Sequence, residues 1–421
     1  MTEDKATQQK KAALVVGGGI SGLTVALETA EAGWPVVLVE RGPSLGGRVA
    51  ANHLYFPKMC PPPCGLEINY QRLRKQPALR VYTLAEVTKV ADGPGGGMAT
   101  ISVKPRYVNE KCTACGKCAE VCPVERPNPH NAGLDTTKAA YLPHATAYPQ
   151  RFAIDMTVCK GKACAKCVEA CAYGAIDLDM AESTVEIEVG AVVAATGWLP
   201  YDAKRIETLG SGAAKNVITN AVMERLAAPA GPTQGKILRP SDGQPPKRVV
   251  FVQCAGSRDR LHLPYCSAVC CTASLKQAGY VRALYPEAEI TMCYIDVRTP
   301  GRLEDFYVKA RDEHKITMLK GKVAKVEEDA RTGEVTLDVE DVLGGGKVRL
   351  KADLVVLATG MPPATKGLPG VAYDENGFAT GAGGKVPVFA AGCAKKPVDV
   401  AAAVQDATGV ALKAIQALVR S

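Results

Sequence analysis

Short apolar runs, separated by glycine-rich turns and amphipathic stretches, dominate the first 200 residues. The uninterrupted apolar run at 12–16 predicts a buried strand, the pattern over 24–32 predicts a helix, and the run at 35–39 predicts a second strand. Further strands are expected within 78–90, at 98–103, at 185–189 and at 191–194. The order strand, helix, strand predicts an α/β fold built on a parallel sheet.

A second unit of the same kind follows a proline- and glycine-rich linker at 227–246. A strand at 248–252, a helix at 267–285 and a strand at 289–297 predict another strand–turn–helix unit. A charged helix is expected at 298–315, and the remaining apolar runs predict strands at 323–327, at 335–339 and from 354, with a closing helix at 400–418.

The turn after the first strand carries the spacing of a dinucleotide-binding loop. Gly17, Gly19 and Gly22 follow the G-x-G-x-x-G pattern, between a strand and a helix whose N-terminus can receive phosphate charge. Glu40 ends the second strand, where an acid suits a ribose hydroxyl pair. The continuation with Arg41, Gly47 and Arg48 resembles two-dinucleotide-domain flavoproteins, which favours FAD over NAD. The alternative is a structural glycine turn.

Eight cysteines between 112 and 171 have the spacing of a bacterial ferredoxin. The run at 112–122 reads C-x₂-C-x₂-C-x₃-C-P, and a second half, whose first gap is two residues longer, occupies 159–171. The ferredoxin crossover assigns Cys112, Cys115, Cys118 and Cys171 to one [4Fe–4S] cluster, and Cys122, Cys159, Cys164 and Cys167 to the other. Zinc or buried core thiols are the alternatives, although zinc sites use paired C-x₂-C knuckles. His130 and His144, in the loop between the halves, are either ligands or solvated.

Two Ala-Thr-Gly segments are typical of crossings between the domains of such flavoproteins. They place Thr196 and Gly197, and later Thr359 and Gly360, at strand ends, while Gly392 and Asp399 fit a pyrophosphate and ribityl site. The predicted fold is therefore a two-dinucleotide-binding-domain flavoprotein with an inserted 2[4Fe–4S] ferredoxin module. Its expected parts are 1–104 and 181–245 (FAD domain and linker), 105–180 (ferredoxin module), 246–352 (second βαβ domain) and 353–421 (closing part of the FAD domain).

The second βαβ turn contains cysteines where nicotinamide-using proteins have another G-x-G-x-x-G. Cys266 and Cys270 are expected on one helix face, with Cys271 beside them and Cys254 at the strand tip. These four thiols form either a third [4Fe–4S] cluster or a buried thiol group. Cys293 is expected in the core. Cys60 and Cys64, in an expected irregular loop at 56–65, are either a redox dithiol or, as preferred here, structural or cluster-shielding residues.

The composition of the chain indicates which kinds of partner and cofactor it can bind. The formal charge of +8 is offset if three clusters and FAD each contribute about −2, so a nucleic-acid role is not favoured. Sixteen cysteines indicate metal rather than disulfides. No run of about 18 uncharged apolar residues predicts a membrane span, and the N-terminus has no apolar leader pattern. A membrane role would therefore need a partner.

The segments 251–259, 265–271 and 275–278 resemble the flavin subunit of heterodisulfide reductase, the HdrA family, and the resemblance extends over residues 12–418. It implies the third cluster and a Lys276 ammonium near the flavin N5. A chain ending without a C-terminal ferredoxin extension looks like QmoA, from the quinone-interacting oxidoreductase of sulfate reducers.

That resemblance implies a second HdrA-like flavoprotein, a membrane protein that carries haem and binds quinone, and adenylylsulfate reductase as partners, at the cytoplasmic face of the membrane. The expected activity is oxidoreductase electron relay between quinone and adenylylsulfate reductase. The alternatives are an HdrA-type subunit with flavin bifurcation, or a free NAD(P)H:acceptor flavoprotein.

Overall fold

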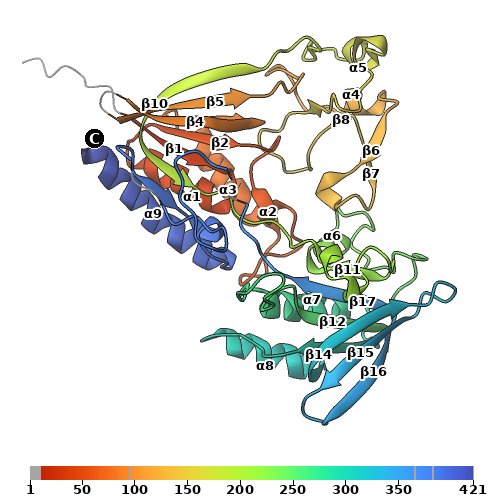
Figure 1. The fold of residues 1–421 in the computed structure, drawn as a ribbon. Coiled ribbons are helices and arrows are strands. Elements are labelled where there is room, and N and C mark those ends of the chain that lie inside the picture. Colours follow the sequence, from red (N-terminus) through yellow and green to blue (C-terminus); the bar gives the residue numbers. More distant parts are fainter. Residues whose placement is uncertain (1–10, 94–95, 365–366, 382–383, 421) are drawn as a thin grey trace, which may run out of the picture.

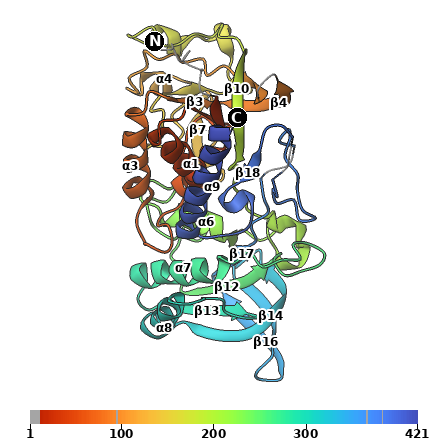
Figure 2. The ribbon, with the colours of Figure 1, turned by 90° about the vertical axis from the view of Figure 1, so that its left-hand side faces the viewer.

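The computed structural model describes residues 11–93, 96–364, 367–381 and 384–420. Figures 1 and 2 show two α/β units stacked along the long axis of the molecule, with much of the cysteine-rich insertion at the end opposite the second unit and part of it reaching back toward that unit. The expected α/β fold class is confirmed. The N-terminal residues 1–10, where no leader was expected, lie outside the described part of the chain.

The first unit is built on a sheet of order β3-β2-β1-β10-β5-β4, with β18 beside β10. Its parallel part comprises β1 (Ala12–Val16), β2 (Val36–Glu40), β3 (Leu79–Thr83), β10 (Ser183–Ala194) and β18 (Val388–Ala390), and its antiparallel part adds β4 (Ala85–Gly93) and β5 (Gly96–Val103). The two strands expected at 185–189 and 191–194 are one strand, because β10 pairs with β5 over its first half and with β1 and β18 over its second.

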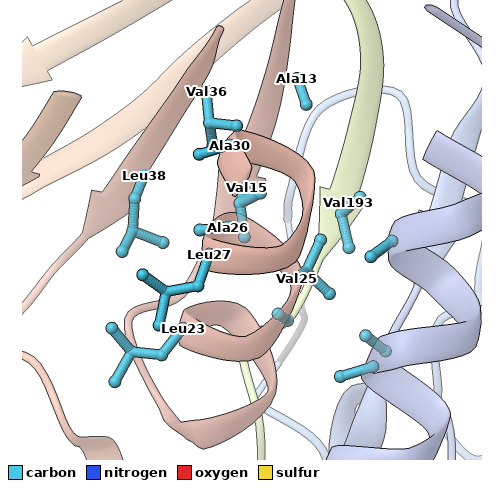
Figure 3. Packing of buried hydrophobic residues seen from close by; sticks show 14 of the residues in the cluster. Ala13, Val15, Leu23, Val25, Ala26, Leu27, Ala30, Val36, Leu38 and Val193 are labelled. Atoms are coloured by element: carbon cyan, nitrogen blue, oxygen red, sulfur yellow. The ribbon is translucent and has the colours of Figure 1, made fainter. Parts of the chain in front are cut away.

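Two helices cover one face of this sheet. α1 (Ile20–Glu31) and α9 (Val400–Arg420) lie side by side, and Figure 3 shows Leu23 and Leu27 of α1 in one buried cluster with Val15 and Val36 of the sheet. Both side chains are fully buried, and burial of each stabilises the fold by about 1.5–3 kcal/mol. The opposite face, with Leu14 of β1, packs on β4 and β5. This double coverage explains why every position of β1 is apolar.

The second unit is a seven-stranded sheet of order β11-β17-β12-β13-β14-β15-β16. Its strands are β11 (Val217–Thr219), β12 (Arg248–Ala255), β13 (Glu289–Tyr294), β14 (Thr317–Glu328), β15 (Val335–Asp341), β16 (Gly346–Ala352) and β17 (Leu354–Thr359), with helices α6 (Asn220–Ala227), α7 (Cys270–Leu284) and α8 (Leu303–Glu313). Residues 228–247, which include all but the first residue of the expected linker, contain no helix or strand. Cys293 is 1% exposed, which confirms it as core.

The insertion is held by short elements around the cysteines. They are the helices α4 (Lys117–Glu120) and α5 (Lys166–Glu169) and the strands β6 (Glu125–Pro127), β7 (Thr136–Lys138), β8 (Ala140–Tyr141) and β9 (Ala153–Ile154). Turns of 3₁₀ helix, η1 (Pro129–Asn131) and η2 (Gly161–Ala163), join them, while η3 (Ala203–Arg205), η4 (Glu207–Leu209) and η5 (Gly392–Ala394) lie elsewhere.

Several local expectations differ from the structure, and three of them concern the starts of helices. α1 begins at Ile20, four residues before the expected start. A short helix, α2 (Gly47–Ala50), precedes the irregular loop expected at 56–65. This loop ends at Pro61, because α3 (Pro62–Arg74) begins at the next residue and the first turn of a helix tolerates proline. α7 begins at Cys270 rather than 267, so Cys266 lies in the preceding loop. The expectation that Cys266 and Cys270 share a helix face is therefore wrong.

Among the helices of the described residues, none has the length and apolar character to cross a membrane.

Candidate cofactor and cluster sites

In the glycine turn after β1, a side chain would clash at Gly17 and Gly22 but would have room at Gly19. A Cβ at Gly22 would lie 1.8 Å from the Gly17 carbonyl oxygen, and one at Gly17 would lie 2.3 Å from the Ala195 carbonyl oxygen. At Gly19, by contrast, the nearest atom to an added Cβ is 3.9 Å away. Gly19 caps α1 without any side-chain hydrogen bond, so the first backbone N–H groups of α1 are free of a side-chain acceptor. This open, uncapped end fits a pyrophosphate.

Glu40 and Arg48 add charged groups beside this turn. The Glu40 carboxylate accepts hydrogen bonds from the backbone N–H of Gly18 (2.7 Å) and of Gly42 (2.6 Å), which fixes it at the end of β2. Gly47, with φ of +53°, passes against Gly19. Arg48 is half-buried, its guanidinium lies 5.1 Å from the centre of the Trp198 ring, and burial lowers its pKa.

A cavity of about 700 Å³ lies where the two units and the insertion meet. Its size is within the range of small-molecule sites. Its walls include five predicted FAD-site residues, namely Gly47, Arg48, Lys276, Thr359 and Asp399. Arg41 is exposed and is not part of this wall, and neither Glu40 nor the glycines of the turn line it, although Gly47 of the wall lies against Gly19. The wall carries four cationic side chains (Arg48, Arg126, Arg225 and Lys276) against two acids (Glu224 and Asp399), which favours an anionic occupant.

The two Ala-Thr-Gly segments lie beside this cavity. The buried Thr196 hydroxyl has no hydrogen-bond partner among the described residues, so it is available to a bound group. Gly197, next to it, has φ of +72° and no atom within 4 Å of an added Cβ. The Thr359 hydroxyl donates to the Asn220 amide oxygen at 2.9 Å. A Cβ at Gly360 would lie 2.4 Å from the Leu263 side chain, which makes Gly360 a packing glycine.

In the closing segment of the FAD domain, Gly392 and Asp399 make different contacts. The Gly392 N–H donates to the Asp406 carboxylate (2.8 Å), and Asp399 accepts from the Ala402 N–H (2.8 Å) in the first turn of α9. Asp399 also lines the cavity. Asp406 was not anticipated, because nothing in its spacing distinguishes it from a helix-surface acid.

Lys276 is buried in an ion pair. Its ammonium lies 2.8 Å from the Glu224 carboxylate and donates to the Leu54 carbonyl oxygen at 2.6 Å, and both charged side chains are at most 7% exposed. Gln277 (2.7 Å) also donates to Glu224. Lys276 is therefore not a solvated lysine on the helix surface. Glu224 and Arg225 were missed, although two adjacent charges in an otherwise apolar stretch were a usable signal.

His130 and His144 are not solvated loop residues either. Their rings stack at 4.9 Å between centroids, both are half-buried, and both line the cavity. Burial, with the Arg225 charge nearby, lowers the pKa of His130 to about 3 and that of His144 to about 4. Both imidazoles are therefore neutral at physiological pH. Among the described residues, no group of three or more His, Cys, Asp or Glu side chains is arranged to hold a single metal ion.

The first ferredoxin cysteine set surrounds a small cavity. Cys112, Cys115, Cys118 and Cys171, the set that the crossover assigns to one cluster, line a common space of about 20 Å³. Backbone N–H groups point at the sulfurs, from Ala114 to Cys112 (3.4 Å) and from Ala175 to Cys171 (3.3 Å). Such N–H···S contacts stabilise thiolate sulfur in iron–sulfur sites.

Three members of the second ferredoxin set, Cys122, Cys159 and Cys167, lie close together. The Cys167 pKa is raised by burial and then by the neighbouring Cys159 thiol, with Cys122 contributing further. Cys164 is half-buried in the turn that precedes α5. The two-residue expansion of the first gap is taken up by η2, and the Gly161 N–H donates to Cys159 sulfur at 3.4 Å.

The third cysteine group lies against the large cavity. Cys254 is the penultimate residue of β12 and has φ of +58°, Cys266 lies in a loop, and Cys270 and Cys271 begin α7. Burial raises the Cys270 pKa, and the Cys271, Cys254 and Cys266 thiols raise it further because they are close. Cys270 also lines the cavity with Lys276. The four thiols therefore come from the end of β12, the loop before α7 and the start of α7, rather than from one face of a helix.

Comparisons with known proteins agree with this chemistry. A sequence model described as an NAD(P)-binding Rossmann-like domain matches residues 15–80, and one described as a 4Fe–4S binding domain matches residues 105–125. The chain is 41% identical over 365 residues to the A-type iron–sulfur subunit of CoB–CoM heterodisulfide reductase from Methanocaldococcus jannaschii, which covers 85% of this chain and 55% of that protein. Over most of its own length the chain is similar to HdrA proteins.

A second HdrA relative, one of two from Methanopyrus kandleri, is 40% identical over 422 residues, 96% of this chain and 64% of the relative. The chain thus spans somewhat more than half the length of these HdrA proteins. Lactococcus lactis thioredoxin reductase has the same fold, with a TM-score of 0.53, 13% identity and coverage of 98% of this chain and all of that one. FAD and [4Fe–4S] clusters are the cofactors that the matches and the residue chemistry support.

Proposed function

We propose that this chain is an HdrA-type electron-transfer subunit that holds FAD in the large cavity and relays electrons through iron–sulfur clusters. The observation that carries the proposal is the composition of that cavity. Its wall combines the FAD-domain loop with Arg48, the insertion loop with His130 and His144, and the start of α7 with Cys270. One bound cofactor would therefore contact the FAD domain, the ferredoxin module and the third cysteine group together.

The residues have separate tasks in this proposal. The open N-terminus of α1 at Gly19 binds the pyrophosphate, Glu40 binds the ribose, and Arg48 supplies a desolvated positive charge. The Glu224 carboxylate and Leu54 carbonyl hold the Lys276 ammonium toward the cavity, where a cation favours a reduced, anionic ring. Bound FAD supplies the exchange between two-electron and one-electron transfer.

The proposed cluster ligands are three sets of four cysteines. The two ferredoxin sets follow the crossover, and the third set comprises Cys254, Cys266, Cys270 and Cys271. Its support is the mutual proximity of the four thiols and the place of Cys270 in the cavity wall. A cluster there would be the one nearest the FAD cavity.

The complex in which the subunit works has two candidates. The first, from the resemblance to QmoA, is a quinone-linked complex with a second HdrA-like flavoprotein, a haem-bearing membrane protein and adenylylsulfate reductase, at the cytoplasmic face of the membrane. The second is a heterodisulfide-reductase-like complex, with or without flavin-based bifurcation, which the names of the relatives favour. A free NAD(P)H-dependent enzyme is disfavoured, because cysteines occupy the second βαβ turn in place of the glycine fingerprint.

Anaerobic isolation of the native protein, with identification of what co-purifies, tests these candidates. A second flavoprotein together with a haem-bearing membrane protein would support the quinone-linked complex. Soluble heterodisulfide-reductase or hydrogenase subunits would support the second candidate. An isolated protein whose flavin is bleached by NADH would refute both, and a protein without FAD would refute the electron-transfer proposal as a whole.

A further inference from the structure

Arg106 is a buried cation whose hydrogen-bond partners are all neutral. It is 5% exposed, and its guanidinium donates to the carbonyl oxygens of Arg151 (3.1 Å), Phe152 (3.4 Å) and Pro43 and to the Thr83 hydroxyl (2.8 Å). Among the described residues, no carboxylate pairs with it, and its partners are carbonyl and hydroxyl oxygens. A buried charge in such surroundings is costly unless another group supplies the opposite charge.

The same guanidinium joins the walls of two cavities. Phe152 lines the space shared by Cys112, Cys115, Cys118 and Cys171, and Pro43 lines the large cavity assigned to FAD. Thr83, whose hydroxyl also accepts a hydrogen bond from Arg106, is the last residue of β3. Arg106 therefore ties the ferredoxin module to the FAD domain through one wall residue of each cavity.

The groups around Arg106 also indicate where its counter-charge comes from. Burial and the nearby Arg151 lower its pKa to about 10, whereas Tyr141 and Cys112 act in the opposite direction. Tyr141 is neutral at physiological pH, because burial raises its pKa. The cysteine set that shares its cavity wall with Phe152, whose carbonyl oxygen accepts a hydrogen bond from Arg106, is left as the source of negative charge. A [4Fe–4S]²⁺ cube held by four thiolates carries about −2 in total, and one more negative charge when reduced.

We infer that Arg106 is the counter-cation of the cluster held by Cys112, Cys115, Cys118 and Cys171, and the positioning residue that fixes this cluster against the FAD cavity. The inference rests on the proposed function, since it requires the cluster and FAD. A fixed, desolvated cation favours the reduced and more negative cluster, so it raises the reduction potential of this cluster above that of the cluster held by Cys122, Cys159, Cys164 and Cys167.

The test is a potentiometric titration of the anaerobic holoprotein followed by electron paramagnetic resonance, with iron and FAD measured on each sample. Arg106→Gln should shift the reduction equilibrium of this one cluster at least about tenfold toward the oxidised form, which is about 59 mV for a one-electron couple. Arg106→Lys, which keeps the charge, should recover most of the shift.

Lys117→Gln is the matched control. Lys117 lines the same cysteine cavity, but its side chain is 63% exposed and its ammonium pairs with Glu120 at 2.8 Å. Solvent screens such a charge, so a change of less than about twofold is expected. A shift as large for Lys117→Gln as for Arg106→Gln would contradict the importance of burial and overturn the inference.

An Arg106→Gln protein with full iron content and an unchanged cluster potential would also overturn it. If this variant does not accumulate, the wild-type protein still decides the question. The higher-potential ferredoxin cluster should be the one lost in Cys115→Ser, and its loss in Cys164→Ser instead would refute the inference. Wild-type protein that contains FAD but no [4Fe–4S] signal would mean that the proposed function has failed, rather than this assignment alone.

Discussion

The substitution Gly19→Ala tests whether the glycine turn after β1 binds the FAD pyrophosphate or has a structural role alone. The backbone of Gly19 is extended, with φ of −73°, and the nearest atom to an added methyl group is 3.9 Å away, so alanine fits the fold without strain. Loss of glycine at the helix N-cap costs up to about 1 kcal/mol, and the lower entropy of the unfolded chain returns about 0.4–1 kcal/mol. The variant should therefore fold with nearly unchanged stability.

FAD binding should respond differently. The methyl group would occupy the open end of α1 and keep a pyrophosphate away from the backbone N–H groups. Loss of one hydrogen bond to a charged group costs about 1.5–3 kcal/mol, which corresponds to roughly 10- to 150-fold weaker binding. Flavin fluorescence quenching, measured as FAD is added to deflavinated protein, gives the affinity, and circular dichroism melting gives the stability.

Two further glycine variants provide the controls. Gly409→Ala, within α9 and with no atom within 4 Å of the added Cβ, should keep FAD affinity and stabilise the protein by up to about 1 kcal/mol. Gly22→Ala should prevent folding of the domain, because its Cβ would lie 1.8 Å from the Gly17 carbonyl oxygen. Wild-type FAD affinity in Gly19→Ala would refute the assignment of this turn to the pyrophosphate.

Three other changes test the remaining parts of the site. Cys270→Ala should lower the iron content from about 12 to about 8 per FAD, and an unchanged ratio would remove the third cluster. Lys276→Met should destabilise the protein by about 3–5 kcal/mol, because it leaves the Glu224 carboxylate buried without its cation. A second change, Glu224→Gln, should restore part of that loss in chemical denaturation, and strictly additive losses would contradict the coupling. His130 and His144 have folded-state pKa values of about 3 and about 4. The unfolded chain binds their protons first, near pH 6.5, so stability should fall as the pH drops from about 6.5 toward 4. A His130→Gln and His144→Gln double variant should show a smaller drop in melting temperature between pH 7.5 and 5.5 than the wild type, and an equal drop would contradict this account.

Local patterns in the sequence determined the cofactor chemistry of this protein. The turn at Gly17, Gly19 and Gly22 needs only neighbours along the chain to define a strand, a tight turn and a helix N-terminus, and the spacing of Cys112 to Cys122 wraps a cluster by short-range geometry. The α/β class followed from the same source, because apolar runs with helices between them have few other ways to be buried. Helix starts were less well predicted, since proline at the first turn of α3 and the loop that holds Cys266 depend on contacts outside those segments.

Only the tertiary structure decided which distant residues share a site. Lys276 meets Glu224 and Leu54, and His130 and His144 meet the cavity wall, because separate elements bring them together; no spacing along the chain encodes such a meeting. Burial likewise decided their chemical state. Lys276 is buried in an ion pair with Glu224. Desolvation keeps both histidines neutral. Arg106 is buried as well, and because its hydrogen-bond partners are neutral, its counter-charge has to come from another group.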